Sequence, residues 1–356
     1  MKGVDESMIE YLPWSKKTLG ELLVSQKEGN IPALDIELTG KCTGACCIYC
    51  DSKPNVRSCG IKGEIDWFTI KKVILDAKKR GLKWIYTCGL GEPMEDEKFW
   101  DLIYLLREND IGLSMFSNGV FIKDRHVAHE LKNHNVNIIL KMDTFNEEKF
   151  DKILGRSGIA CKIFEARDYL LEAGYGTREN YTDLAFSIVP TQLSIDGIAE
   201  VVKFCKQNGI FASIGELEQA GEVINNNLND TLSISENEIK ELKIIADSYF
   251  QGSYMRPICP CILTGLHIDN FGNCVVDKDT GLNCKWFLLK DPCTTILGNV
   301  GDDNVFSLFE KVNSYRKNCF KNNLNLIQSS CSISYTFGGC GGNPKDIIEL
   351  VLKQYE

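Results

Sequence analysis

The feature that most constrains this fold is the alternation of short apolar runs with amphipathic stretches over the first 250 residues. ALDIELT (33–39) and KWIYT (83–87) are predicted strands, and residues 66–81 between them carry apolar side chains at helical spacing. This strand–helix rhythm recurs about six times, which predicts a parallel sheet with helices outside it. We therefore expect an α/β fold, best described as a partial (β/α)6 TIM-like barrel. A doubly wound open sheet would show the same alternation, so the periodicity alone leaves both architectures open.

The rhythm changes after residue 250. HIDNFGNCVVD (267–277) predicts a β-hairpin, because polar turn residues with a glycine separate two strand-like runs. The composition changes as well, since eight of the 16 cysteines lie between Cys259 and Cys340. We predict an N-terminal extension over 1–31, a barrel domain over 32–250 and a small, cysteine-rich α+β domain over 251–356.

The overall composition is that of an acidic globular protein. The formal net charge is −9 and the pI is about 5.2, which argues against a broad surface for nucleic acid or anionic membranes. The N-terminal stretch has no apolar signal core, and no run reaches the roughly 18 apolar residues that a membrane span needs. We therefore expect a cytoplasmic protein, whose reducing surroundings favour metal-ligating or catalytic thiols over disulfides.

Four cysteines lie within residues 42–50, directly after the first predicted strand. Short cysteine spacings on one loop let several thiolates bind an iron–sulfur cluster, and three such ligands leave the fourth iron open. Zinc sites usually combine two cysteine pairs, or a cysteine pair with a histidine pair, and no histidine lies near this loop. The structural alternative is a set of buried cysteines that act as small hydrophobic residues. The spacing favours the iron–sulfur cluster.

The run LTGKCTGACCIYC resembles the cluster loop of the radical SAM enzymes, whose usual form is CxxxCxxC with an aromatic residue before the last cysteine. The resemblance implies a [4Fe-4S] cluster on Cys42, Cys47 and Cys50, with Tyr49 as the aromatic residue. The first gap is then one residue longer than usual. Cys46 is the rival ligand, because it has the family's usual spacing from Cys42. Against it, the residue three positions later is Tyr49 and not a cysteine.

Further points of resemblance follow later predicted strands. GLGEP (89–93) is similar to the family's GGEP motif, in which backbone and carboxylate hold the amino group of S-adenosylmethionine (SAM). The amino group binds iron through its nitrogen lone pair, and its N–H groups need acceptors such as a carboxylate and backbone carbonyls. SNG (117–119) and KMD (141–143) are similar to family positions near the carboxylate and ribose of SAM. The cofactor-binding residues implied are Gly91, Glu92, Pro93, Ser117, Asn118, Lys141, Asp143 and, on the fifth strand, Ser187.

The C-terminal cysteines resemble the SPASM/twitch extension of radical SAM maturases, which carries one or two auxiliary iron–sulfur clusters. One departure concerns Asp277, which stands where the family commonly has a cysteine. Either Asp277 is an oxygen ligand, or Cys274 or Cys284 replaces the missing thiolate. A closed structural zinc site is the alternative. The candidate auxiliary ligands are Cys261, Cys274, Cys284, Cys319, Cys331 and Cys340.

These resemblances imply an enzyme that reductively cleaves SAM to a 5′-deoxyadenosyl radical, which abstracts a substrate hydrogen with auxiliary clusters assisting. A flavodoxin or ferredoxin would supply the electron. Extensions of this kind occur most often on enzymes that act on peptides, which favours oxidative modification or cross-linking of a peptide or protein side chain. One alternative is a small-molecule dehydrogenase, or an enzyme of a cofactor or tetrapyrrole pathway. Another is a non-catalytic metal-binding scaffold, for which the C-terminal thiols would suffice.

Overall fold

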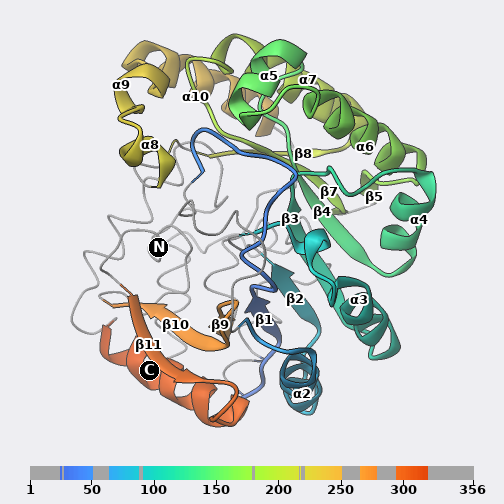
Figure 1. Ribbon diagram of the computed structural model, residues 1–356, viewed down its shortest axis with the longest axis vertical. Helices are drawn as coiled ribbons and strands as arrows, with labels where there is room; N and C mark the ends of the chain where they lie inside the picture. Colours follow the sequence, from blue (N-terminus) through green and yellow to red (C-terminus); the bar gives the residue numbers. More distant parts are fainter. Residues whose placement is uncertain are drawn as a thin grey trace, which may run out of the picture.

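The computed structural model describes residues 25, 28–50, 64–87, 91–178, 181–215, 217, 221–250, 265–278 and 294–319. A parallel β-sheet forms the centre of the protein, and helices cover its outer side (Figure 1). The parallel strands that alternate with helices are β1 (Ala33–Ile36), β2 (Trp84–Thr87), β3 (Gly112–Ser117), β4 (Val136–Lys141), β7 (Leu184–Ile188) and β8 (Phe211–Ile214). The helices between and after them are α2 (Trp67–Lys78), α3 (Phe99–Glu108), α4 (Arg125–Asn133), α5 (Glu147–Leu154), α6 (Ala160–Glu172), α7 (Ile198–Asn208) and α10 (Glu236–Phe250).

Shorter elements join these units. They are the 3-10 helices η3 (Pro93–Glu95) and η4 (Ile195–Gly197), the small helices α8 (Glu222–Asn225) and α9 (Asn229–Leu232), and the two-stranded ribbon of β5 (Thr177–Arg178) and β6 (Tyr181–Thr182).

The order of the strands distinguishes between the two architectures that the sequence left open. β1, β2, β3, β4, β7 and β8 are neighbours in chain order, and every adjacent pair is parallel. In a doubly wound sheet the order of the strands would reverse at a switch point, while the strands themselves stay parallel. The described strands show no reversal within this run, so the predicted α/β fold with a partial TIM-like barrel is confirmed.

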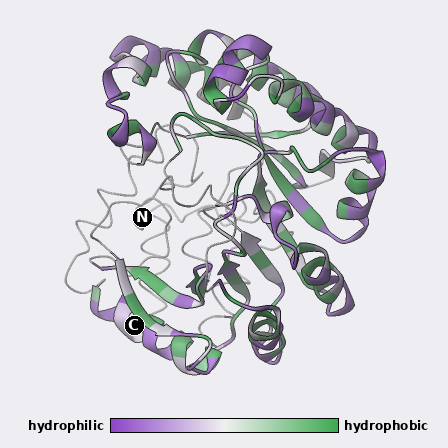
Figure 2. Cartoon of the chain, in the orientation of Figure 1, coloured by the Kyte–Doolittle hydropathy of each residue, from purple (hydrophilic) through white to green (hydrophobic). Residues whose placement is uncertain are grey.

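The helices follow the local signals of the sequence. The Asp66 side chain accepts a hydrogen bond from the Thr69 amide at 3.0 Å and so begins α2. Buried Ile70 and Val73 lie on the side of α2 that faces the sheet, and the same division recurs in the other helices. Figure 2 shows hydrophilic residues gathered on the outward sides of the helices and hydrophobic ones along the strands. Within the described residues, no helix combines the length and apolarity needed to cross a bilayer.

The C-terminal segment extends the same sheet. Strand β9 (Leu266–Ile268) pairs parallel with β1, with Leu34 opposite Leu266. Strands β10 (Asn273–Asp277) and β11 (Thr294–Asn299) follow it antiparallel, and a helix spans 305–319. The hairpin predicted over 267–277 is therefore confirmed. The sheet crosses the boundary predicted near residue 250, and the division into three domains stays a prediction.

Candidate metal and cofactor site

The cysteine loop leaves the carboxyl end of β1 and rests against the end of α5. The Cys46 amide donates to the Leu154 carbonyl at 2.8 Å, and the Ile48 amide donates to the Ile153 carbonyl at 2.9 Å. Gly155 ends α5 with a φ of 65°, and a Cβ atom there would lie 2.2 Å from the Cys46 carbonyl oxygen. Only glycine permits this approach. The second half of the loop is therefore fixed by backbone contacts.

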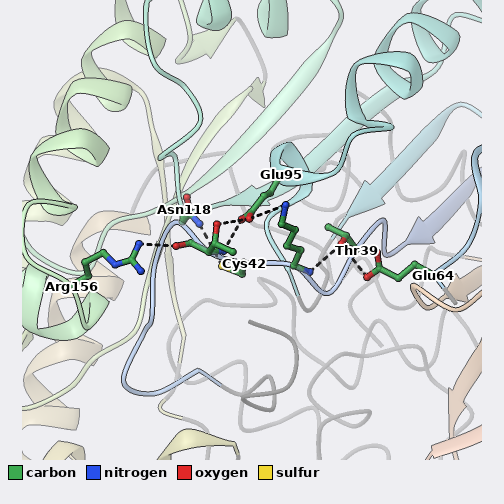
Figure 3. Close-up of polar contacts among 8 residues, drawn as sticks. Thr39, Cys42, Glu64, Glu95, Asn118 and Arg156 are labelled. Carbon is green, nitrogen blue, oxygen red and sulfur yellow. Dashed lines mark hydrogen bonds and ion pairs between the residues drawn. The ribbon is translucent and has the colours of Figure 1, made fainter. Parts of the chain in front are cut away.

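The first half of the loop is held by side chains from neighbouring loops (Figure 3). The Glu95 carboxylate accepts hydrogen bonds from the Thr43 amide at 2.7 Å and the Thr43 hydroxyl at 2.5 Å. The Arg156 guanidinium donates to the Thr43 carbonyl at 2.9 Å, and the Lys41 ammonium lies 3.6 Å from Glu95. These contacts brace the longer gap after Cys42. Glu95 was not among the predicted site residues, because no residue spacing shows that its carboxylate reaches the cysteine loop.

Glu92 links the end of β2 to the end of β3. Its buried carboxylate accepts from the Ser117 hydroxyl at 2.8 Å and from the Asn118 amide at 2.7 Å. Burial raises the pKa of Glu92 to about 7, although the hydrogen bonds from Asn118 and Ser117 act in the opposite direction. Its amide donates to the Lys41 carbonyl at 2.8 Å, which ties it to the cysteine loop. The predicted contact of its carboxylate with the amino group of SAM stays a prediction.

The residues on either side of Glu92 also approach this loop. A Cβ atom on Gly91 would lie 2.4 Å from the Thr39 carbonyl oxygen and 2.6 Å from that of Lys41. Glycine is therefore required by the close passage of two backbones. Pro93 begins η3, for which Glu92 is the N-cap. The predicted Gly91–Pro93 motif thus lies directly against the cysteine loop.

The thiols of Cys47 and Cys50 lie close enough to Cys42 to affect its pKa. Burial raises the pKa of Cys42 to about 12, and the negative charges of Glu92, Cys47 and Cys50 act in the same direction. Cys46 lies toward α5, where its Cβ atom would be 3.3 Å from a Cβ atom on Gly155. Among the described residues, no three His, Cys, Asp or Glu side chains form a group that could hold a metal ion. The thiolates of a cubane bind separate iron atoms and need not converge on one point.

A second polar group joins the cysteine loop to β4. The Tyr49 hydroxyl donates to the Asp143 carboxylate at 2.5 Å, and the Lys141 ammonium lies 2.9 Å from the same oxygen. Lys141 also donates to the Tyr49 hydroxyl, and the other Asp143 oxygen accepts from the Val189 amide at 2.8 Å. Asp143 is fully buried. Burial and the Asp143 charge raise the pKa of Tyr49 well above its usual value, which keeps the phenol protonated.

Lys141 is held as a cation by its surroundings. Burial opposes its charge, but Asp143 and the thiols of Cys47 and Cys50 outweigh that effect and raise the pKa of Lys141. Ser187 is the register partner of Lys141 on the adjacent strand β7. The structure therefore brings Lys141, Asp143, Tyr49 and Ser187 together at the carboxyl ends of the strands, beside the cysteine loop.

Two polar contacts, the first of them buried, attach the C-terminal hairpin to β1 and to the start of the loop. His267 bonds to Asp35 at 3.0 Å; burial opposes its charge, but Asp35 and Glu37 raise the pKa of His267 to about 9. The Glu64 carboxylate accepts from the Gly40 amide at 2.7 Å, and from the Thr39 hydroxyl and the Asn270 side chain at 3.0 Å each. Nothing in the sequence singled out these contacts, because their partners are far apart along the chain.

The predicted auxiliary ligands are described only in part. Cys274 lies on β10 and is fully buried, which raises its pKa to about 12. Cys319 is buried at the end of the helix over 305–319, and Asp277 ends β10. That these residues bind an auxiliary iron–sulfur cluster stays a prediction. The remaining candidates, Cys261, Cys284, Cys331 and Cys340, lie outside the described residues.

Comparisons with known proteins agree with this geometry. Residues 36–210 match the Radical SAM superfamily. The structure of Streptococcus suis SuiB bound to precursor peptide SuiA superposes with a TM-score of 0.54 at 15% identity, over 91% of this chain and 74% of that one. SuiB bound to S-adenosylmethionine gives a TM-score of 0.51 at 16% identity, over the same shares of the two chains. These likenesses show a shared fold.

No curated protein matches this chain by sequence. The superfamily match begins at the last residue of β1 and covers the cysteine loop and the strands that bring Glu92, Asn118 and Lys141 to the same end of the sheet. Residues 36–210, just under half of the chain, therefore match a radical SAM domain, a superfamily whose enzymes use a [4Fe-4S] cluster and S-adenosylmethionine.

Proposed function

We propose that this protein is a radical SAM enzyme that holds its [4Fe-4S] cluster through Cys42, Cys47 and Cys50. The observation that carries the proposal is a convergence at the carboxyl ends of the strands. The cysteine loop there meets both the Glu92–Asn118 network and the Tyr49–Lys141–Asp143 group. Parallel barrels carry their chemistry at this end. Cys46 packs against the end of α5 through its amide and carbonyl, which supports leaving it out of the ligand set.

The chain's own residues would bind and orient the cofactor. When bound, the reduced cluster supplies the electron that splits SAM into methionine and a 5′-deoxyadenosyl radical able to abstract hydrogen. The Lys141 ammonium, beside Ser187, suits the carboxylate or ribose of SAM. The buried Tyr49 and Asp143 exclude water from one side of the loop and hold it against β4. A flavodoxin or ferredoxin would deliver the electron.

We further propose that the substrate is a side chain of a peptide or protein, which is oxidised or cross-linked. The support is the shared fold with SuiB, whose structure has been solved with a precursor peptide. The test is to express the enzyme with short peptides encoded beside its gene and to measure their masses. A loss of two hydrogens from one peptide is the expected result. Turnover of a small molecule, with no change in any such peptide, would refute the peptide substrate.

The cluster assignment is tested by anaerobic reconstitution and two measurements, iron content and 5′-deoxyadenosine. Alanine at Cys42, Cys47 or Cys50 should abolish 5′-deoxyadenosine formation and remove one cluster. Cys46→Ala should keep 5′-deoxyadenosine formation and the full iron content. Cys161→Ala is the matched control, because Cys161 is a half-buried thiol on α6 that bonds only locally to the Gly158 carbonyl. If the unmodified protein forms no 5′-deoxyadenosine, the chain is a metal-binding scaffold and the proposal fails.

Auxiliary clusters are counted in the same samples. Iron and sulfide quantitation of the unmodified protein, with Mössbauer spectra to identify the cluster type, should give about eight or twelve irons per chain if one or two auxiliary clusters are present, and about four if none is. The combined Cys42→Ala, Cys47→Ala and Cys50→Ala variant should keep only the auxiliary irons. A variant that binds no iron would show that the C-terminal thiols ligate no cluster.

A further inference from the structure

The side-chain amide of Asn118 faces the sulfur of Cys42. The nitrogen Nδ2 lies 3.7 Å from Sγ, a normal length for a hydrogen bond to sulfur (Figure 3). Asn118 is 8% exposed, so little water competes for this contact. It follows the last residue of β3 and enters the site from the strand next to β2, whereas Cys42 comes from the loop after β1. The contact therefore joins the loop after β1 to the end of β3.

The orientation of this amide is fixed by its other contacts. The two ends of an asparagine amide are distinguished only by their hydrogen-bond partners. Here the oxygen Oδ1 accepts from the Val120 amide at 2.9 Å, so the NH2 group must point toward Cys42. The backbone amide of Asn118 donates to the Glu92 carboxylate at 2.7 Å. Asn118 is thus held at its backbone and at its oxygen, and its remaining donor is directed at the sulfur.

A donor in this place has a defined electrostatic effect. Hydrogen bonds to the ligand sulfurs are among the factors that set the potential of an iron–sulfur cluster. Reduction adds one negative charge to the cluster and its thiolates. An N–H donor therefore stabilises the reduced form more than the oxidised form, and this makes the cluster easier to reduce.

We propose that Asn118 raises the reduction potential of the cluster by donating a hydrogen bond to the Cys42 thiolate. This inference rests on the proposed cluster at Cys42, Cys47 and Cys50, and gives Asn118 a role separate from its predicted contact with SAM. Asn118 is a positioning and tuning residue, because it acts through Cys42. The proposal also gives the buried Glu92 carboxylate a role, because Glu92 accepts a hydrogen bond from the Asn118 amide and so fixes the backbone that carries the donor.

The test is a redox titration of the reconstituted protein without SAM, followed by electron paramagnetic resonance. The signal of this cluster is identified by its loss in Cys50→Ala. Asn118→Ala removes the donor and should lower the ratio of reduced to oxidised cluster about tenfold at a fixed potential, a shift of about 59 mV for one electron. Ser117→Ala is the matched control, because Ser117 bonds to the same Glu92 carboxylate but donates nothing to Cys42. It should change the ratio less than about twofold.

A second variant guards against loss of the cluster in Asn118→Ala. Asn118→Asp keeps an oxygen for the Val120 amide and the backbone bond to Glu92, and replaces the donor facing Cys42 by a negatively charged oxygen. Its added negative charge should lower the potential further than alanine does. Unchanged potentials in both variants, with full iron content, would overturn the inference and leave the proposed function intact. Absence of any such cluster from the unmodified protein would overturn the proposed function itself.

Discussion

Replacing Gly91 by alanine tests how closely the GLGEP turn packs against the cysteine loop. The new methyl group would lie 2.4 Å from the Thr39 carbonyl oxygen and 2.6 Å from that of Lys41. Ordinary contact begins at 3.4 Å, so the loop must retreat by about 1 Å. Both obstacles are backbone atoms, which cannot rotate away. Overpacking of this kind costs about 1–3 kcal/mol of folding free energy.

The retreat also moves the first cluster ligand. Cys42 follows Lys41 directly, and the Lys41 carbonyl holds the Glu92 amide at 2.8 Å. Metal sites tolerate errors of only about 0.2 Å in their distances. We therefore expect Gly91→Ala to lose most of the iron and sulfide bound by this cluster, as well as stability. The measurements are iron and sulfide per chain after anaerobic reconstitution, and urea unfolding of the same samples.

The control for Gly91→Ala is alanine at Gly158. A Cβ atom there would meet nothing within 4 Å, and only the left-handed φ of 73° opposes it. Gly158→Ala should cost about 1–2 kcal/mol through backbone strain and keep the full cluster content. Retention of full iron by Gly91→Ala, with an unchanged unfolding midpoint, would refute the reasoning.

Three further predictions concern the contacts around the loop. The raised pKa of His267 contributes about 3 kcal/mol of stability below pH 6.5, which is lost as the pH rises through about 9. Urea unfolding at pH 6.5 and 9.5 should show this loss in the unmodified protein and not in His267→Gln. Lys141→Met leaves the Asp143 carboxylate buried without its cation and should cost about 3–5 kcal/mol in urea unfolding. Glu64→Ala removes the acceptor of three hydrogen bonds and should speed amide exchange at Gly40, measured by mass spectrometry.

Each of these predictions has an outcome that contradicts it. Equal pH dependence in His267→Gln and in the unmodified protein would mean that other groups titrate in this range. Lys141→Met at full stability would show that the bonds to Asp143 from Tyr49 and from the Val189 amide suffice. Unchanged exchange at Gly40 in Glu64→Ala would mean that the loop holds its shape without the C-terminal hairpin.

Much of the barrel could be predicted because its signals are local. Apolar periodicity marks β1 and α2 within a few residues, and parallel strands must then meet at their carboxyl ends. For that reason Glu92 and Asn118, which follow different strands, were expected in one site. There the Asn118 amide nitrogen lies 2.7 Å from a carboxylate oxygen of Glu92. The cysteine loop was likewise expected at the end of β1, where the structure has it.

Other parts of the site depend on contacts that no local pattern records. β9 has three residues and pairs with β1, and nothing in so short a run specifies its partner. Glu95 and Glu64 bind backbone amides of the loop, which depends on the path of that loop rather than on residue spacing. The hydrogen bonds that the Glu92 carboxylate accepts from Ser117 and Asn118 at the end of β3 were likewise not predicted, and its contact with SAM stays a prediction.

Pairing of β9 with β1 sets the order in which a nascent chain completes its sheet. Asp35 and His267 are register partners although 232 positions separate them. At a synthesis rate of about 5–20 residues per second, β1 waits roughly 10–50 s for its second neighbour. Throughout that interval, the strand that leads into the cysteine loop has an unfinished edge. We therefore expect the cysteine loop to accept iron only after β9 has paired with β1.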